Sequence, residues 1–201
     1  NGYDLVFAPM QYLITDELST KIRAYIENGG RIVADIRTGV KDWNNRALPE
    51  MLPGPFAGLF GLHVIDYDCL RGTEQYVRWG GDESTDEPAA KWADVVELNG
   101  ATALATFTRD YYRDSPAVTE HTRENGTAYY VATELGRENM KRFVFHVLEQ
   151  AGIRGVLDTP DGVEAVLRPG AEGNMLFVLN HTEIRHSVSV PTGWKPVVAP
   201  E

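Results

Sequence analysis

The N-terminal end of the chain reads as a strand, a helix and a second strand, and this order limits the fold more strongly than any other feature. Residues 3–8 form a short apolar run, which Pro9 ends because proline has no backbone N–H to donate to a sheet. Thr15 is a suitable N-cap for the helix, and Gly29 suits its left-handed end. Apolar residues in between recur at helical spacing: Leu18, Ile22, Tyr25 and Ile26. With residues 31–36 as the second strand, the segment predicts a right-handed βαβ unit and therefore a parallel sheet.

Further strands and a second helix follow. Asn-Gly pairs tolerate positive φ angles, so Asn99-Gly100 and Asn125-Gly126 each predict a hairpin between the apolar runs beside them. A helical turn is expected at residues 56–61. Between Gly136 and Gly152, apolar residues have the spacing of an amphipathic helix. The runs that we expect to form strands are residues 62–67, 73–79, 92–98, 101–106, 117–122 and 127–133.

Two segments are predicted to be loops. Residues 37–55 are rich in Gly, Asn and Pro, and a joint of this length inside a compact domain is usually functional or lies at an interface. Residues 80–88 carry Asp and Glu between glycines and a proline, which is typical of a solvated surface loop. A calcium-binding loop is the alternative for the second segment, but the spacing of an EF-hand is absent.

The character of the chain changes after Val156. Turn residues at Thr159-Pro160-Asp161-Gly162 mark a domain boundary, so we expect a first domain at residues 1–157 and a second at residues 158–201. The second domain is predicted to hold three short antiparallel strands, at residues 163–168, 175–180 and 186–190. A domain this short cannot bury a core of its own, so it should pack on the first domain or continue beyond Glu201.

Composition excludes several functions. The net charge of −10 argues against binding to nucleic acid or to an anionic membrane surface, because both depend on Lys and Arg. The single Cys69 excludes an intrachain disulfide and a multi-cysteine zinc site. It also fits a reducing compartment, and the N-terminus shows no signal-peptide pattern, so a cytoplasmic location is expected. No apolar run reaches the length of about 18 residues that a membrane helix needs.

Motifs for cofactor binding and covalent catalysis are absent. The βαβ start suggests a nucleotide site, but neither the glycine fingerprint nor a P-loop occurs, so no cofactor is expected. A serine nucleophile would need the motif G-x-S-x-G, which is missing. Cys69 follows two carboxylates in Asp66-Tyr67-Asp68-Cys69-Leu70, where a reactive thiolate is disfavoured, and we interpret it as inert. Glycosidases use two facing carboxylates, but no such pair stands out here, so no catalytic residue is assigned.

Histidine spacing predicts no metal site. None of the five histidines forms an H-x-H or H-E-x-x-H motif. His181 and His186 flank one turn and could approach each other, but no third ligand is placed near them. His146 lies beside the apolar positions of the second helix, so we expect a packed or surface residue there.

Several segments together resemble one known family. One group of later segments fits the same domain as the N-terminal residues: 52–55, 59–62 and the helix end at 151–153. A second group resembles a small C-terminal β-domain: 164–168 and 177–181. The most specific residues are Tyr3-Asp4-Leu5-Val6, Ala8-Pro9, Thr15-Asp16-Glu17, Ile22, Ala24-Tyr25-Ile26, Gly29-Gly30, Arg37-Thr38-Gly39-Val40-Lys41-Asp42 and Asn45. On these residues the first 157 positions resemble the middle domain of the bacterial β-galactosidases of glycoside hydrolase family 42.

This resemblance implies a fold and a function. Enzymes of the family hydrolyse terminal β-D-galactosides with retention, using two glutamates on an N-terminal (β/α)₈ barrel that is absent from this sequence. The middle domain has a flavodoxin-like fold, related to class I glutamine amidotransferases, and mediates trimer formation. The resemblance therefore implies an α/β domain with a mostly parallel sheet, followed by an incomplete antiparallel β-domain. It also implies a homotrimer that is inactive alone and meets a galactoside only through the missing barrel.

One loop carries the residues that we consider for a site. A large aromatic together with guanidinium, ammonium, carboxylate and amide groups suits an interface hot spot or a rim that faces a sugar. The alternative is a surface loop whose polar groups bond to one another. The candidates are Arg37, Lys41, Asp42, Trp43, Asn44, Asn45 and Arg46.

Two other functional classes remain open from the sequence. A free-standing flavodoxin-like module that binds a small molecule or a carbohydrate is the main alternative to an assembly domain. The start of the chain directly at a strand predicts instead a piece of a longer chain. An amidotransferase-like enzyme is the third possibility, but it would need Cys69 as its nucleophile.

Overall fold

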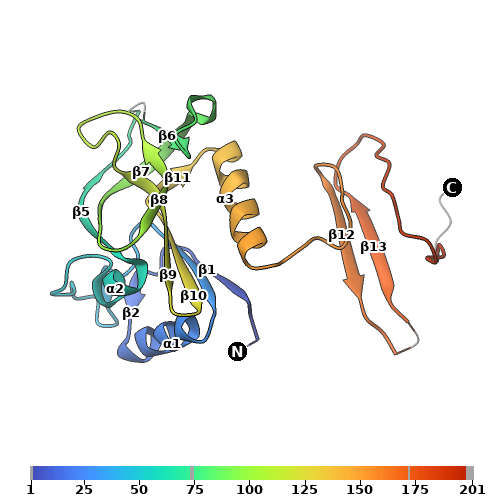
Figure 1. Ribbon diagram of the computed structural model, residues 1–201, viewed down its shortest axis with the longest axis horizontal. Helices are drawn as coiled ribbons and strands as arrows, with labels where there is room; N and C mark the ends of the chain where they lie inside the picture. The colour runs from blue at the N-terminus through green and yellow to red at the C-terminus, as the bar shows by residue number, and fades with distance from the viewer. Residues whose placement is uncertain (1, 73–74, 172, 198–201) are drawn as a thin grey trace. The chain divides into compact units, whose positions relative to one another are not determined.

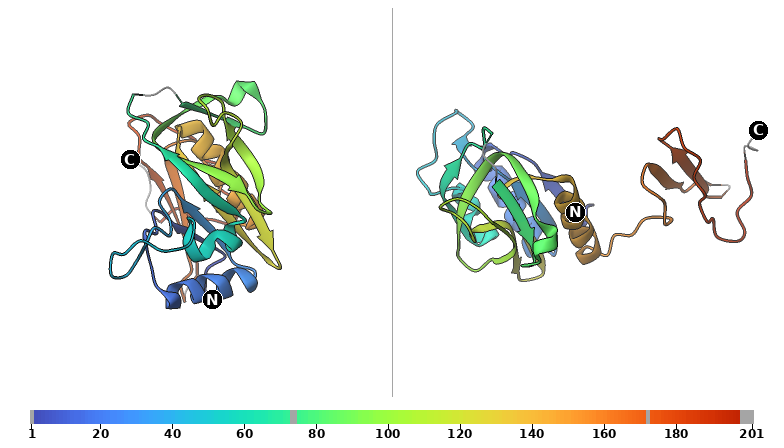
Figure 2. Two further views of the ribbon diagram at one scale, coloured as in Figure 1. Left: turned by 90° about the vertical axis from the view of Figure 1, so that its left-hand side faces the viewer. Right: turned by 90° about the horizontal axis from the view of Figure 1, so that it is seen from above.

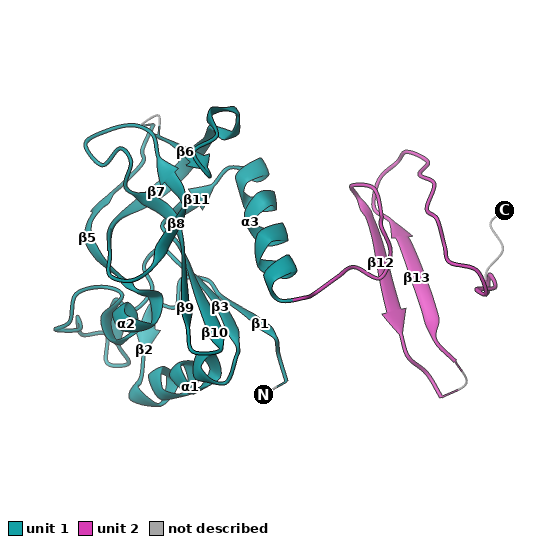
Figure 3. Ribbon diagram, viewed as in Figure 1, with its two compact units in different colours: residues 1–151 teal, residues 152–201 magenta. Residues whose placement is uncertain are grey.

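The computed structural model describes residues 2–72, 75–171 and 173–197. It divides the chain into two compact units, residues 1–151 and residues 152–201, which Figure 3 shows in separate colours. The first unit holds a nine-stranded sheet with its helices, and the second holds a two-stranded sheet.

Within its described residues, the first unit contains three α-helices and most of the strands (Figure 1). The helices are α1 (Asp16–Glu27), α2 (Ala57–Phe60) and α3 (Arg137–Gln150), and single 3₁₀ turns occupy Gly54–Phe56 and Glu83–Thr85. Its strands are β1 (Leu5–Ala8), β2 (Leu13–Ile14), β3 (Arg31–Asp35), β4 (Lys41–Asp42), β5 (Leu62–Asp68), β6 (Gln75–Trp79), β7 (Glu87–Leu98), β8 (Thr102–Phe107), β9 (Pro116–Arg123), β10 (Gly126–Val131) and β11 (Thr133–Leu135).

The large sheet is mixed, not mostly parallel as the sequence predicted. Its strand order is β1-β3-β10-β9-β8-β6-β7-β11, with β5 paired to β7. Parallel pairing joins β1 to β3 and β3 to β10, whereas the other pairs in this sheet are antiparallel. The expected βαβ unit is present as β1, α1 and β3. The prediction of a mostly parallel sheet was wrong because the later strands are joined by short loops that reverse the chain, and such loops give antiparallel neighbours.

Strand β10 lies at the junction of the two kinds of pairing. It pairs in parallel with β3, Thr127 opposite Arg31, and antiparallel with β9, Tyr130 opposite Thr119. All six of its residues are buried. The ring of Tyr129 packs against Phe143 of α3, and the next side chain, Tyr130, packs against Phe60 of α2. Since neighbouring residues of a strand point to opposite faces, α2 and α3 cover opposite faces of the sheet, which Figure 2 shows from two further directions.

The two Asn-Gly predictions had different outcomes. Strands β9 and β10 form the hairpin expected at Asn125-Gly126. The hairpin expected at Asn99-Gly100 was wrong, because β6 lies between β7 and β8 in the sheet. Instead the amides of Asn99 and Ala101 both donate to the carbonyl of Gly61, so this turn wraps around the end of α2.

Helix α1 has the ends that the sequence predicted. The hydroxyl of Thr15 accepts the N–H of Leu18, and Gly29 follows the helix at φ +91°. Gly126 begins β10 directly beside this end of the helix. A Cβ at Gly126 would overlap the carbonyl oxygens of Ile26 and Gly30, which are backbone atoms and cannot rotate away. This glycine is therefore required for close packing of α1 on β10, not for a positive φ.

The remaining elements agree in part with the sequence. The helical turn at α2, the strands β5 and β6 and the amphipathic helix α3 are confirmed, although residues 73 and 74 of the expected strand lie outside the described residues. In the second unit, β12 (Val163–Arg168) pairs antiparallel with β13 (Met175–Asn180). The third strand expected at residues 186–190 was wrong, since this described segment has no regular secondary structure.

The close approach at Gly126 predicts a large loss of stability for Gly126→Ala. The added methyl group must push α1 away from β10, which should lower the free energy of unfolding by about 1–3 kcal/mol or more. The matched control is Gly58→Ala, because Gly58 is exposed within α2 and an added Cβ would meet only Arg123 Nη1, at an ordinary contact distance of 3.9 Å. Urea unfolding should show the control as neutral or slightly more stable. Equal unfolding midpoints for the two variants would contradict this account of the contact.

Candidate functional site

The loop that leaves β3 is tied to the segment before α1. Strand β4, which lies in this loop, pairs in parallel with β2. Next to this pair, the N–H of Gly39 donates to the carbonyl of Gln11, and the N–H groups of Val40 and Lys41 both donate to that of Tyr12. The first half of the loop is therefore fixed by backbone hydrogen bonds to another segment.

Arg37 stands in a stack of aromatic rings. Its backbone is in the left-handed region, at φ +61°. Its guanidinium carbon lies 5.2 Å from the ring centroid of Tyr12 and 4.8 Å from that of Trp92, and Tyr67 stacks on Trp92 with centroids 4.8 Å apart. A guanidinium placed over aromatic faces is attracted by the negative electrostatic potential that the ring quadrupole creates there. The side chain of Arg37 is thus used within the chain to hold the start of the loop.

The tip of the loop is closed by its own polar groups. Lys41 Nζ donates to Asn45 Oδ1 (2.9 Å), and the N–H of Arg46 donates to Asp42 Oδ1 (2.8 Å). Asn45 lies at φ +63°, which permits the tight turn. The structure therefore brings four of the seven sequence-predicted residues together, while Arg37 lies apart in the stack described above.

The two remaining candidates face outward. Trp43 is 72% exposed, and Asn44 is also exposed. An indole with this much exposed surface, held on a turn of fixed shape, is what a protein–protein contact uses as an anchor.

Sequence reasoning missed a buried carboxylate behind the loop. Asp94 lies on β7 and is only 3% exposed. It accepts hydrogen bonds from the Trp92 indole N–H (2.8 Å), the Tyr130 hydroxyl (2.7 Å) and the backbone N–H of Arg37 (3.3 Å). Burial raises the pKa of Asp94 above its ordinary value of 3.8, and these hydrogen bonds act in the opposite direction. The available signal was a single acid inside the apolar run Ala93-Asp94-Val95-Val96.

A second carboxyl group, the half-buried Asp35, lies at the carboxyl end of β3. Its Oδ1 accepts the N–H of Met10, which follows β1. Burial raises the pKa of Asp35 above 3.8, and the negative charge of Asp94 raises it further. The site thus contains two carboxyl groups that are both harder to ionise than in water.

Asp35 also borders a cavity of about 300 Å³ at the carboxyl ends of β1 and β3, beside α3. This edge is where α/β sheets commonly bind ligands. Most of the lining is apolar, from Phe7, Pro9, Met10, Val33, Ala34, Ile36, Val131, Met140 and Phe143, and its polar members are Asp35, Thr133 and Glu134. The N–H of Met10 is already bonded to Asp35, and Glu134 pairs with Lys91 (2.7 Å). The cavity therefore suits an apolar group better than a phosphate.

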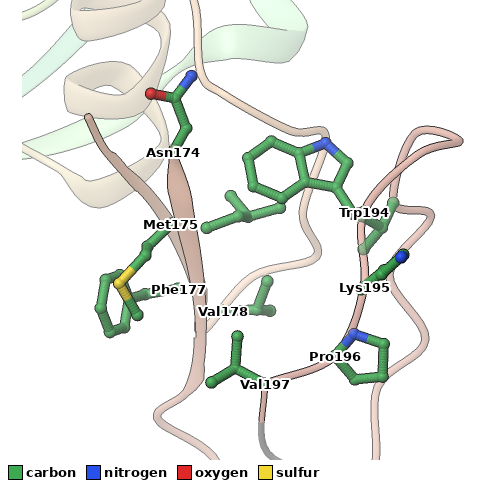
Figure 4. Close-up of a pocket in the computed structure, with 10 residues that line it drawn as sticks. Asn174, Met175, Phe177, Val178, Trp194, Lys195, Pro196 and Val197 are labelled. Carbon is green, nitrogen blue, oxygen red and sulfur yellow. The ribbon is translucent and has the colours of Figure 1, made fainter. Parts of the chain in front are cut away.

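The second unit has an apolar groove of about 530 Å³ beside β13. Figure 4 shows Val178 on the side of β13 that faces Trp194, Pro196 and Val197, whereas Met175 and Phe177 project to the other side of the strand. Lys195 and Asn174 supply its polar groups. The groove has the composition of a surface that contacts apolar groups.

Neither a cluster of metal ligands nor a membrane-spanning helix occurs among the described residues. Within the part of the chain that the structure describes, no three His, Cys, Asp or Glu side chains come together as a metal site would require. His181 and His186 are each bonded to another side chain, Nε2 of the first to Glu164 (3.0 Å) and Nε2 of the second to Thr182 (3.0 Å). Cys69 is exposed. Among the described residues, no helix has the length and apolar character to cross a membrane.

The raised pKa of Asp35 predicts a pH dependence of stability. A carboxyl group whose pKa is raised on folding contributes stability below its unfolded pKa, near 3.8, and this contribution is lost as pH rises through the folded pKa. Asp35→Asn keeps the acceptor for Met10 but cannot ionise. Between pH 4 and 7, the free energy of unfolding of the wild type should therefore fall relative to that of the variant, as measured by urea unfolding.

Asp86→Asn is the control of opposite sign. Arg78 lies 2.8 Å from Asp86 and lowers the pKa of that carboxyl group, so its contribution is present at neutral pH and lost on acidification. If the wild type and Asp35→Asn keep a constant difference across this pH range, the burial argument for Asp35 is wrong.

Comparisons with known proteins place this geometry in a family. Residues 1–154 match the model of the β-galactosidase trimerisation domain. The β-galactosidase LacZ of Heyndrickxia coagulans is 34% identical over 183 residues, which are 90% of this chain and 27% of that protein. The β-galactosidase BglY of Alicyclobacillus acidocaldarius is 30% identical over 205 residues, covering 98% of this chain and 30% of that protein. The chain thus spans less than a third of the length of these relatives.

Solved structures agree with the relatives. The crystal structure of the β-galactosidase from Rahnella sp. R3 has a TM-score of 0.87 and 29% identity, and the match covers 95% of this chain and 29% of that one. Gan42B, a family 42 β-galactosidase from G. stearothermophilus, has a TM-score of 0.83 and 28% identity over 90% of this chain and 26% of its own. The chain therefore belongs to the β-galactosidase trimerisation domain family, the middle domain of glycoside hydrolase family 42 enzymes.

Proposed function

We propose that this chain assembles a homotrimeric β-galactosidase and that the hydrolysis of terminal β-D-galactosides takes place on a (β/α)₈ barrel outside this sequence. The observation that carries the proposal is the match of residues 1–154 to the trimerisation domain. The similarity to solved β-galactosidases at 28–29% identity supports it as well. The proposal assigns the chain a structural role, with no catalytic residue, cofactor or metal of its own.

The loop at residues 37–46 is our proposed contact surface, either in the trimer interface or at a rim near a substrate. Its support is the combination of a fixed backbone with the exposed Trp43. A preorganised loop loses little conformational freedom on binding, and tryptophan is among the residues that contribute most at interfaces. The internal hydrogen bonds of Lys41, Asp42 and Arg46 are consistent with this role, because they leave the indole as the group available to a partner.

Three finer points complete the proposal. A flavodoxin-like fold is supported by the βαβ unit of β1, α1 and β3 and by the parallel pairing of β3 with β10. A domain boundary near residue 157 is supported by the turn residues that follow it. A cytoplasmic location is supported by the single cysteine, which would have no disulfide partner within the chain.

The proposed interface predicts that Trp43→Ala weakens self-association. Loss of one central tryptophan should reduce association by about 2 kcal/mol per contact, or about thirtyfold in the dissociation constant. Sedimentation equilibrium over a range of concentrations measures the effect. Phe145→Ala is the control, because Phe145 is 61% exposed on α3. A wild type that remains monomeric at all concentrations would contradict trimer formation by this chain.

The proposed structural role predicts that the chain does not hydrolyse a chromogenic β-galactoside. A family 42 β-galactosidase assayed in parallel serves as the positive control. Turnover above the buffer rate that disappears when a glutamate of this chain is changed to glutamine would refute the role, because it would place a catalytic carboxyl group here.

A further inference from the structure

The carboxylate of Asp94 connects three parts of the fold that are distant in sequence. Tyr130 comes from the buried strand β10, Trp92 from β7 itself, and Arg37 from the start of the loop that carries Trp43. Tyr130 and Arg37 both donate to Oδ2, while Trp92 donates to Oδ1. Because an ionised carboxylate only accepts hydrogen bonds, it can serve all three donors at once.

We infer that Asp94 is a positioning residue, which holds the loop at residues 37–46 in the conformation that self-association requires. The part of this inference that concerns self-association rests on the proposed function. The part that concerns the shape of the loop rests on the contacts of Asp94 alone. The two parts can therefore fail separately.

The contacts show how one carboxylate can act at a distance. It fixes the backbone of Arg37, which lies at φ +61°, a conformation that few residues other than glycine adopt. It also fixes the indole of Trp92, on whose ring the guanidinium of Arg37 rests at 4.8 Å. Backbone and side chain of Arg37 are thus held by the same carboxylate, one directly and the other through Trp92. Because the chain continues from Arg37, this contact also sets the direction in which the rest of the loop at residues 37–46 leaves β3.

Charged and titratable groups around Asp94 make its state depend on pH. Asp35 at the end of β3 repels a charge on Asp94, Arg37 attracts it, and the Tyr130 hydroxyl bonds to it. Lys91 and Glu134, from β7 and β11, pair with each other (2.7 Å). Burial raises the pKa of Asp94, so acidification protonates it before an exposed carboxyl group. Because a protonated carboxyl group cannot accept all three hydrogen bonds equally well, the hydrogen bond between Asp94 and the start of the loop should weaken.

The test uses two tyrosines that follow each other on β10. Both are fully buried, but only Tyr130 reaches Asp94, since Tyr129 points to the other face against Phe143. Tyr130→Phe should raise the hydrogen-exchange rates of the Gly39, Val40 and Lys41 amides about tenfold, the factor expected for one buried hydrogen bond to a charged acceptor. Tyr129→Phe should leave these rates unchanged. Amides of β9 should exchange equally slowly in both variants, which separates a local from a global effect.

Asp94→Asn is the second variant. An amide offers one acceptor and one donor, so it must lose the bond to Trp92 or the bonds to Tyr130 and Arg37. The variant should show the same local increase in exchange of the loop. Where this variant fails to fold, the Tyr130→Phe and Tyr129→Phe pair decides the question, because the aromatic rings remain in place.

NMR spectroscopy can follow the protonation of the Asp94 carboxylate directly. The indole N–H of Trp92 donates to Asp94, so its NMR resonance, assigned with Trp92→Phe, should shift as pH falls through the raised pKa of Asp94. The exposed indole of Trp43 is the internal reference and should not follow this titration. If Asp94 only stabilised the fold, the pH at which the Trp92 resonance shifts would not match the pH at which the loop amides begin to exchange faster.

The results separate the two parts of the inference. Faster loop exchange together with weaker self-association in Tyr130→Phe supports both. Faster exchange with unchanged self-association overturns the role of Asp94 in assembly and leaves its positioning of the loop supported. Unchanged loop exchange in folded Tyr130→Phe and Asp94→Asn overturns the inference, whatever the oligomeric state.

Discussion

The backbone pairing of β10 is the constraint on which the rest of the first unit depends. One edge of this strand bonds in parallel to β3, and the other bonds antiparallel to β9. Every residue of β10 is buried, so none of its polar backbone groups can rely on water. The strand thus joins the N-terminal βαβ unit to the antiparallel strands, and both helical layers pack on its side chains. A shift of its register would disturb both halves of the sheet together.

Local features of this fold could be predicted from the sequence, and pairing between distant segments could not. The N-cap at Thr15, the end of α1 at Gly29 and the face of α3 depend on residues a few positions apart, and the structure confirms them. Whether a later strand pairs in parallel with β3 or instead forms an antiparallel pair depends on strands far along the chain. The Asn99-Gly100 prediction failed for this reason: the turn residues are suitable, but β6 occupies the place beside β7 that β8 was expected to take.

The same distinction applies to the site. Residue types in the loop at residues 37–46 drew attention to it, and its internal hydrogen bonds are close in sequence. The hydrogen bonds that hold the start of this loop were not predictable, because Asp94 contacts Arg37 and Tyr130 only after the sheet has formed. An acid within an apolar strand is a useful signal in such a case. It must either be neutralised or find donors, and here it finds three.

The parallel pair of β3 and β10 has a consequence for how this chain folds during synthesis. Arg31 pairs with Thr127, 96 residues further along the chain, and closing such a loop is slow compared with forming local contacts. A ribosome releases β1, α1 and β3 well before it makes β10, which leaves one edge of β3 without a strand partner for that interval. Until the β9–β10 hairpin emerges, this edge of β3 is open, and an unpaired strand edge is a place where a strand of another chain can add.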